Sequence, residues 1–202
     1  MITILASLAV VLLAYLMGAI PTGLLVARLR GVDIQTAGSG NIGATNVMRT
    51  VGPWAGIAVL IVDPLKGVLA VMVPTLLGLD PWWVAAAALA AVVGNGFNVF
   101  LRFRGGKGVA TSLGVFVVID PWVTLTALIV FALALVFGRM VSLASVVAVC
   151  ATPFMLVLLG DASVTKIALA FALALLSVWR HRDNLGRLAA GTERRVGKPR
   201  PG

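Results

Sequence analysis

Long apolar segments separated by short polar breaks constrain this chain more than any other feature. Hydrophobic residues make up 60% of the 202 positions and charged residues only 11%, whereas soluble domains carry about 25% charged residues. A backbone that contacts lipid must satisfy its own hydrogen bonds, so apolar segments of this kind form helices. The sequence therefore predicts an all-α, polytopic integral membrane protein.

The polar breaks divide the chain into seven apolar segments. These are residues 2–27, 52–78, 82–101, 109–119, 122–137, 141–159 and 164–179. The fourth segment is shorter than the roughly 20 residues that a helix needs to cross a bilayer, so it crosses only if neighbours shelter it or its loop extends it. The first residues lack the basic region of a signal peptide, and we expect the first segment to be a retained span.

The distribution of charge orients the predicted spans. If every break is a turn at a membrane face, the basic loops collect on one side and Asp80, Asp120 and Asp161 on the other. Basic loops stay in the cytoplasm, so seven transmembrane helices place the amino terminus outside and the carboxy terminus inside. The net charge of +9 then follows from topology, and no nucleic-acid partner is expected.

We expect one membrane domain over residues 1–193 and a basic, disordered tail over residues 194–202. The tail ends in Gly-Lys-Pro-Arg-Pro-Gly, which cannot bury enough apolar surface to fold. The single cysteine, Cys150, can form no internal disulfide.

The polar stretch GSGNIGATNVMR, residues 38–49, lies between two apolar segments. Glycine lets backbone N–H groups approach an anion closely, and arginine offers a forked cation suited to phosphate. The stretch is therefore a candidate phosphate-binding loop, although a glycine-rich connector between helices remains the alternative. Its G-x-G-x-x-G spacing lacks the preceding strand of a dinucleotide site. The candidate ligands are Ser39, Gly40, Asn41, Thr45, Asn46 and Arg49.

Residues 102–108, RFRGGKG, form a second glycine-rich basic loop that leads into a helix N-terminus. Unpaired N–H groups and a partial positive charge at such a terminus favour anions. The loop is not a P-loop, because Leu101 stands where that motif needs glycine and Gly108 where it needs Ser or Thr. A simple positive-inside anchor is the alternative, but an anchor needs no backbone freedom. The candidate ligands are Gly105, Gly106, Lys107 and Gly108.

Asp63 and Lys66 lie inside the second apolar segment. A charged residue there costs roughly 2.5 to 3.5 kcal/mol on insertion scales, and the i,i+3 spacing lets the two side chains pair on one helix face. The pair either lines or braces an active site, or it locks two helices together. The sequence leaves both interpretations open.

His181, the only histidine of the chain, lies at the inner end of the last predicted span. Asn184 and Arg187 follow at i+3 and i+6, so the three side chains can share one helix face. A solvated helix end is the alternative. Ser142, at the start of the sixth segment, offers a hydroxyl that is either a ligand or a helix N-cap.

These stretches together resemble the bacterial acyl-phosphate-dependent glycerol-3-phosphate acyltransferases, the PlsY family. The resemblance covers nearly the whole chain and rests on GSGNIGATNVMR, DPLKG, GGKGVAT, VSLAS and RHRDNL, in the family's order. It implies a seven-span fold in the bacterial cytoplasmic (inner) membrane, with the active site facing the cytoplasm. It also implies transfer of a fatty acyl group from acyl phosphate to the 1-hydroxyl of glycerol 3-phosphate, which gives lysophosphatidic acid and phosphate at the first step of phospholipid synthesis.

Matching positions carry the family's phosphate-handling and catalytic roles onto particular residues of this chain. These residues are Ser39, Thr45, Arg49, Lys107, Ser142, His181 and Asn184. The family usually has Gly-His before the lysine loop, with Pro three residues after that His, whereas Asn95 and Asn98 occupy these two positions here. Asparagine does not titrate, so no histidine role can fall on position 95.

The residue types suit acyl transfer from an activated donor, which mainly requires orientation of two anions and stabilisation of an oxyanion. We expect Ser39, Lys107, His181 and Asn184 to be catalytic, with His181 acting either as a base or as a hydrogen-bonding partner of the substrate. No metal or cofactor is expected. The rival class is a small channel or transporter for phosphate-type anions. The sequence shows no internal repeat to support it, and it does not predict the oligomeric state.

Overall fold

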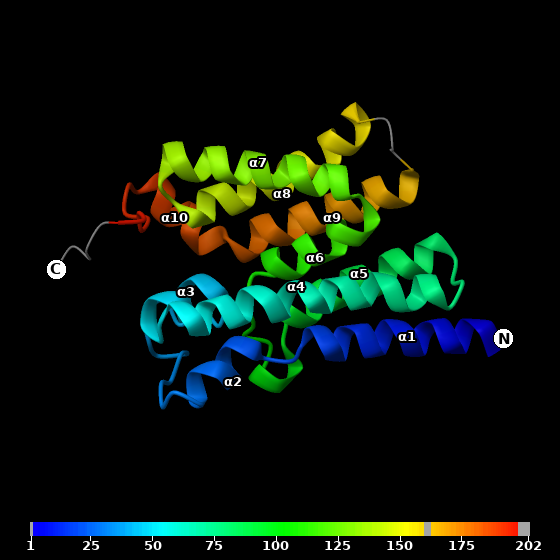
Figure 1. Cartoon of the computed structure of the whole chain (residues 1–202), viewed down its shortest axis with the longest axis horizontal. Helices are drawn as coiled ribbons and strands as arrows, with labels where there is room; N and C mark the ends of the chain where they lie inside the picture. The colour runs from blue at the N-terminus through cyan, green and yellow to red at the C-terminus, as the bar shows by residue number, and fades with distance from the viewer. Residues whose placement is uncertain (1, 160–162, 198–202) are drawn as a thin grey trace. The chain divides into compact units, whose positions relative to one another are not determined.

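The computed structural model describes residues 2–159 and 163–197. Over these residues the protein is helical and contains no strand, which confirms the all-α prediction (Figure 1). The chain divides into two compact units, Met1–Ile119 and Asp120–Gly202, called unit 1 and unit 2 below.

Unit 1 contains the first helices of the chain and both glycine-rich loops. Its elements are α1 (Ile2–Gly18), α2 (Thr22–Arg28), α3 (Ala44–Thr50), α4 (Pro53–Leu76), α5 (Pro81–Gly96), the 3-10 helix η1 (Val99–Leu101) and α6 (Val109–Ile119). Helix α4 packs against α5 and α6, and α1 lies along α5 (Figure 1). A Cβ atom on Gly67 would lie 2.1 Å from the Thr111 carbonyl oxygen, and one on Gly114 only 1.9 Å from that of Pro64. Helices α4 and α6 therefore touch through their backbones, as small residues allow in membranes.

The first predicted span is broken into α1 and α2. Pro21 stands at the N-cap position of α2 and cannot continue the ladder of α1. Two side chains from distant parts of unit 1 bind the carbonyl groups exposed at this break. The Asn98 amide donates to Ala19 O, and the Lys66 ammonium donates to Ile20 O at 2.6 Å.

Residues 44–50 form helix α3, so the second half of the candidate phosphate-binding loop, predicted over residues 38–49, is helical. This helix is hard to predict because it has only 7 residues and follows a run of glycines. Its last carbonyl groups help to turn the chain into α4, since the N–H groups of Val51 and Gly52 both donate to Val47 O.

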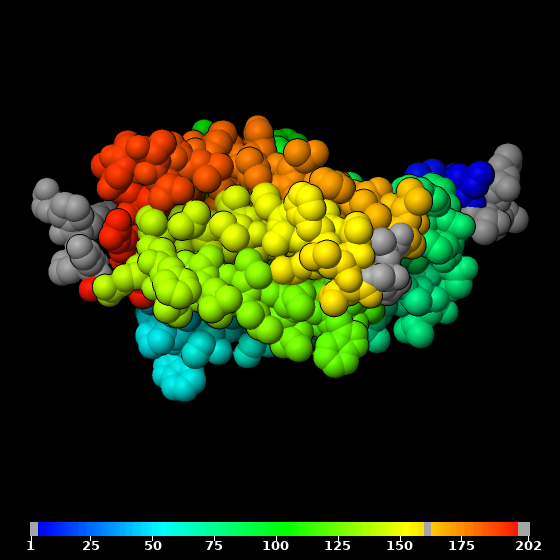
Figure 2. Space-filling view, turned by 90° about the horizontal axis from the view of Figure 1, so that it is seen from above, coloured from blue at the N-terminus to red at the C-terminus, as the bar shows by residue number. Residues whose placement is uncertain are grey.

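Unit 2 consists of successive helices that pack in chain order. They are α7 (Pro121–Gly138), α8 (Val141–Leu158), α9 (Val164–Arg180) and α10 (Arg182–Ala189). Helix α8 packs against both α7 and α9 (Figures 1 and 2). The Asp120 carboxylate accepts the Val123 N–H group at 2.9 Å and caps α7. Helix α10 bends away from α9 by 60° at His181.

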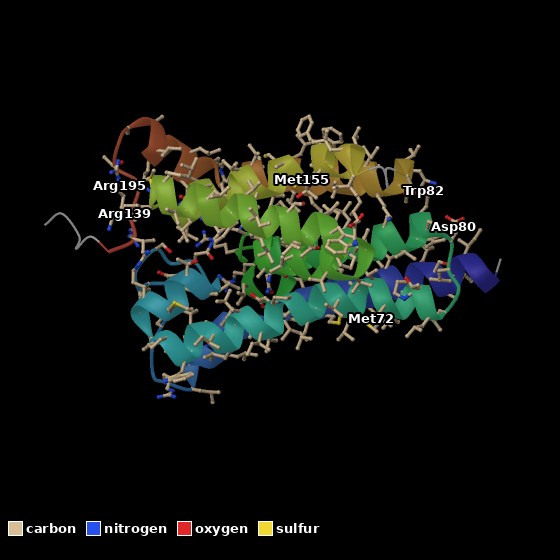
Figure 3. All side chains as sticks on the ribbon, turned by 45° about the horizontal axis from the view of Figure 1, so that its top comes forward. Met72, Asp80, Trp82, Arg139, Met155 and Arg195 are labelled. Carbon is tan, nitrogen blue, oxygen red and sulfur yellow. The ribbon has the colours of Figure 1, made fainter. Side chains whose placement is uncertain are left out.

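The carboxy-terminal segment returns to the connection between α7 and α8. The Val196 N–H group donates to Arg139 O at 2.7 Å, and Arg139 and Arg195 lie at the same end of unit 2 (Figure 3). Val196 of the predicted tail therefore contacts the connection between α7 and α8, whereas residues 198–202 lie outside the described part of the chain. Asp161, used above to orient the spans, also lies outside it.

The helices have the lengths and surfaces of a membrane protein. Within the described part of the chain, five segments are long and apolar enough to cross a bilayer, and one of these is the 25-residue segment Ile4–Arg28, which contains α2 and most of α1. The number rises to six if the bent pair α9–α10 counts as one span. Helix α6 has only 11 residues. Large apolar side chains such as Leu13, Leu65 and Phe137 are exposed on the long helices, as expected where lipid replaces water. Seven passes and the orientation of the termini stay predictions.

Candidate active site

Asn46 organises the first glycine-rich loop of unit 1. Its side chain is 3% exposed. The Oδ1 atom accepts the Ser39 N–H group at 2.9 Å, and Nδ2 donates to Ala37 O at 3.0 Å and to Asn41 O at 2.9 Å. Both N–H groups of the amide are thus used inside the protein. The structure places Asn46 beneath the loop as its support, and the predicted role as a phosphate donor does not fit this geometry.

Other backbone N–H groups of this loop are also occupied. Gly40 N–H donates to Ala37 O at 3.0 Å, and Gly43 N–H donates to Asn41 Oδ1 at 2.8 Å. Gly38 and Gly40 have φ angles of 65° and 71°, a region that favours glycine. The glycines of this loop are therefore explained by its tight path. Of the candidate phosphate-binding residues in this loop, three are exposed and could contact a phosphate through their side chains, namely Ser39, Thr45 and Arg49.

The second loop of unit 1 is folded onto the end of α5. Gly105 N–H donates to Gly96 O at 3.1 Å and Gly106 N–H to Asn95 O at 2.9 Å. Gly108 N–H donates to the side-chain oxygen of Asn95 at 3.2 Å. A Cβ atom on Gly105 would lie 2.0 Å from Asn95 O, so close backbone packing explains that glycine. The prediction that these glycine N–H groups point at an anion is not what the structure shows.

Lys107 is half-buried between Gly106 and Gly108, both of which are buried. The loop thus holds a single cationic side chain on a backbone that is fixed on either side. Asn95, at 5% exposed, was not among the predicted site residues. The only sequence signal for it was its place at a position where the family usually has histidine.

The Asp63–Lys66 pair is a brace inside unit 1. The ammonium lies 2.6 Å from the Asp63 carboxylate, and the side chains are 10% and 4% exposed for Asp63 and Lys66. The Lys66 ammonium donates a second hydrogen bond to Ile20 O at the α1–α2 break. The geometry favours the interpretation in which the pair locks helices together, because the ammonium is already shared between two acceptors.

Glu193 is the centre of a polar cluster in unit 2. One carboxylate oxygen accepts the Ser142 hydroxyl at 2.7 Å and the Asn184 amide at 2.6 Å, and the other accepts Arg187 Nε at 2.8 Å. The Glu193 side chain is only 6% exposed. Burial by itself raises the pKa of Glu193, but the bonds from Ser142, Asn184 and Arg187, with the charge of Arg187, bring the pKa below its ordinary value.

The cluster changes the interpretation of Ser142. Met140, not Ser142, occupies the N-cap position of α8, and no side chain caps it. A hydroxyl has one proton to donate, and that of Ser142 goes to Glu193. Ser142 therefore helps to hold Glu193 in this conformation and cannot donate to a phosphate at the same time. Sequence reasoning missed Glu193, because it lies 51 positions from Ser142 in a stretch without periodicity.

His181 is buried at the bend between α9 and α10, with 1% of its surface exposed. The alternative of a solvated helix end is therefore wrong. Nδ1 lies 2.8 Å from Ser177 O. A carbonyl oxygen only accepts hydrogen bonds, so Nδ1 carries the proton and Nε2 is the basic nitrogen of the neutral ring. Asn184 follows on the first turn of α10 and is tied to Glu193.

Comparison with known proteins decides the family. A family model described as glycerol-3-phosphate acyltransferase matches residues 8–191. This chain belongs to the glycerol-3-phosphate acyltransferase family. Among curated members, the chain is 52% identical to the glycerol-3-phosphate acyltransferase of Geotalea daltonii over 89% of this chain and 92% of that protein. It is 47% identical to the one of Thermus thermophilus, over 93% and 94%.

Solved structures of the family show the same fold. Crystal structures of PlsY (YgiH), an integral membrane glycerol 3-phosphate acyltransferase, are 40% identical in sequence and cover 95% of this chain and 96% of the solved chain. The TM-score is 0.90 for the glycerol 3-phosphate form and 0.88 for the lysophosphatidic acid form. This family resemblance is the one that the five sequence motifs predicted.

Proposed function

We propose that this chain transfers a fatty acyl group from acyl phosphate to the 1-hydroxyl of glycerol 3-phosphate, which gives lysophosphatidic acid and inorganic phosphate. The observation that carries the proposal is the match, at a TM-score of 0.90, to a family member in its glycerol 3-phosphate form. The second form of that protein, with lysophosphatidic acid, supports the product. Acyl phosphate as the donor rests on the motifs of the PlsY family.

Unit 1 supplies cations for the phosphate groups of the two substrates. Lys107 and the exposed Ser39 hydroxyl bind one phosphate, and Arg49 binds the other. Thr45 lies one helical turn before Arg49 on α3 and adds a hydroxyl donor on the same face. Lysine and arginine side chains offer cationic donors, which suits binding of two anionic substrates.

Unit 2 supplies the histidine that can take up the proton of the attacking hydroxyl. The hydroxyl oxygen of glycerol 3-phosphate attacks the acyl carbon, and the bond between that carbon and the phosphate oxygen breaks. The hydroxyl proton goes either to Nε2 of His181 or to the departing phosphate, and in the second case His181 hydrogen-bonds the substrate. Glu193 fixes Asn184 and Ser142 beside this histidine segment.

We also propose that residues 1–193 act as one membrane acyltransferase domain. The protein spans the bacterial cytoplasmic membrane seven times, with the amino terminus outside and both glycine-rich loops on the cytoplasmic side. The positions of the basic loops support this orientation, and the short α6 is the segment on which the seventh pass depends.

The donor can be tested with the purified protein. Acyl phosphate and glycerol 3-phosphate together should give lysophosphatidic acid and phosphate, whereas acyl-coenzyme A or acyl carrier protein in place of acyl phosphate should give none. Direct use of either thioester would refute the proposed donor. Uptake of labelled glycerol 3-phosphate into sealed vesicles without any acylated product would favour the transporter class.

Lys107 can be tested by substitution. Loss of one preorganised donor to an anion that develops in the transition state costs about a hundred- to thousandfold in kcat, and we expect this loss for Lys107→Ala. Lys107→Arg should restore little, because a planar fork needs a different approach from a compact ammonium. Lys166→Ala is the matched control, since Lys166 is also half-buried but lies at the far end of α9 from His181. Near-normal turnover of Lys107→Ala would mean that this loop serves only as a positive-inside anchor.

A further inference from the structure

In the loop of residues 105–108, the backbone N–H groups that a phosphate-binding loop would offer to its ligand already donate hydrogen bonds to the end of α5. In loops that cradle phosphate, successive backbone N–H groups point at the anion. Here the N–H groups of Gly105, Gly106 and Gly108 all donate to residues 95 and 96 at the end of α5. A phosphate could take over these donors only if the loop left α5.

Leaving α5 is unfavourable in this structure. Gly105, Gly106 and Gly108 are buried, and so are Asn95 and Gly96. A buried acceptor or donor that loses its partner costs the full desolvation penalty of the group. The loop would expose several such groups at once, because Gly105, Gly106 and Gly108 bind through separate acceptors.

Asn95 holds the loop on both sides of Lys107. Its main-chain oxygen accepts from Gly106, the residue before the lysine, at 2.9 Å. Its side-chain oxygen accepts from Gly108, the residue after the lysine, at 3.2 Å. A Cβ atom on Gly106 would lie 2.7 Å from that side-chain oxygen, so the fit leaves no room for another residue. The position of Lys107 is thus set by one residue that is itself anchored in α5.

We propose that Asn95 is the positioning residue for Lys107, whose ammonium group binds an anion in the function proposed above, and that the N–H groups of Gly105, Gly106 and Gly108 stay bound to α5 while it does so. The inference deepens the function proposed above and rests on it for the identity of the anion. A neutral amide suits this role, because it offers an acceptor to Gly108 without adding a negative charge beside a site for anions.

The first experiment measures binding of inorganic phosphate by titration calorimetry, for the full-length protein and for Lys107→Ala. A hydrogen bond to a charged group is worth enough to change affinity about ten- to hundredfold, so Lys107→Ala should bind phosphate at least about tenfold more weakly. Unchanged phosphate affinity in Lys107→Ala would assign the anion to other groups and overturn the proposal. This readout needs no turnover, so it remains valid even if the proposed acyl transfer fails for the native protein.

The second experiment measures kcat, KM and thermal stability for two variants of Asn95. Asn95→Ala removes the acceptor for Gly108, and a misplaced Lys107 should then lower kcat about ten- to hundredfold. Asn95→Asp keeps an oxygen acceptor in the same place but adds a negative charge beside the anion, so it should recover only part of the kcat lost in Asn95→Ala and should raise KM for glycerol 3-phosphate. Failure of aspartate to restore any of the rate lost in Asn95→Ala would overturn the positioning role.

Asn98→Ala is the matched control, because Asn98 is also a buried asparagine in this segment, but its side chain binds Ala19 O and Phe100 N–H and none of the loop glycines. It should lower the unfolding temperature while kcat per folded molecule stays near the native value. An equal loss of kcat in Asn98→Ala and Asn95→Ala would mean that general softening of unit 1 explains the effect, and the proposal would fall. If the native enzyme turns over normally and Asn95→Ala does not lower kcat, the positioning role of Asn95 is refuted while the proposed acyl transfer stands.

Discussion

The Asp63–Lys66 pair offers a direct test of whether buried charge in unit 1 braces the fold or serves the reaction. The perturbations are Lys66→Met, Asp63→Leu and the double variant with both changes. Lys66→Met leaves the Asp63 carboxylate, whose side chain is 10% exposed, without its cation, and Asp63→Leu leaves the Lys66 ammonium with Ile20 O as its acceptor. The double variant leaves no charge at all. Ile20 O then keeps the Thr22 N–H group at 2.9 Å as its donor.

The structure sets the expected magnitudes. Removal of one partner from a buried ion pair costs about 3 to 5 kcal/mol, whereas replacement of both partners by apolar residues is often neutral. Each single variant should therefore lose about 3 kcal/mol or more, and the double variant should lose less than either. For a chain of this length, 1 kcal/mol shifts the midpoint by about 2 to 4 °C, so Lys66→Met should unfold about 10 °C below the native protein.

The assay follows helical circular dichroism on heating in detergent micelles and, below the transition, turnover per folded molecule. A brace predicts a double variant with a midpoint near that of the native protein and near-normal turnover. A double variant that is as unstable as Lys66→Met would show that the two charges are not coupled. A stable double variant that has lost turnover about a hundredfold would show that the pair acts on the substrates, and the structural interpretation would be wrong.

Three further predictions concern His181, Glu193 and the topology. His181→Gln should lose the acidic limb of the pH–rate profile between pH 5 and 8, where imidazole changes charge, because a protonated ring cannot take up the hydroxyl proton; an unchanged limb would assign that proton to the leaving phosphate. The pKa of Glu193 is lowered in the folded protein, so its stabilising effect is present above its ordinary value of 4.5 and is lost as the pH falls through the folded value. Thermal unfolding from pH 7 to 3 should thus show a steeper acid loss in the native protein than in Glu193→Gln, and parallel curves would contradict the cluster's role. In a Cys150→Ala background, cysteine at Leu77 should react with an impermeant thiol reagent from outside and cysteine at Arg139 should not; outside labelling at 139 would exclude seven passes.

The helices were largely predictable because lipid leaves the chain few alternatives. Apolar segments bounded by Gly, Pro and Asp gave the ends of α4, α7, α8 and α9 to within a few residues. The break between α1 and α2 was not predicted, although Pro21 lies within it. The partners that stabilise the break come from Lys66 and Asn98, which are 46 and 79 positions away. A single sequence gives no sign of pairings at that distance.

The glycine-rich loops show why residue type predicts chemistry less well than it predicts geometry. Glycine indicates that something approaches the backbone closely, but it does not say what. At Gly105 the neighbour is the main chain of Asn95, and at Gly38 it is the side chain of Asn46. The motifs located the polar regions of the protein correctly. In the structure the N–H groups of Gly105, Gly106 and Gly108 have partners inside the protein, as buried N–H groups nearly always do.

Glu193 extends this argument to the charged residues. By residue type it was one of a few carboxylates on the inner side of the chain, just before a basic tail. In the fold it accepts bonds from Ser142, Asn184 and Arg187, which come from α8 and α10. Two of the residues assigned to substrates by resemblance are therefore held by a third that carries a negative charge. Because Arg187 balances that charge, the cluster can keep the Asn184 amide in one orientation beside the His181 segment. Asn184 should consequently depend on Glu193 for its position, in the same way that Lys107 depends on Asn95.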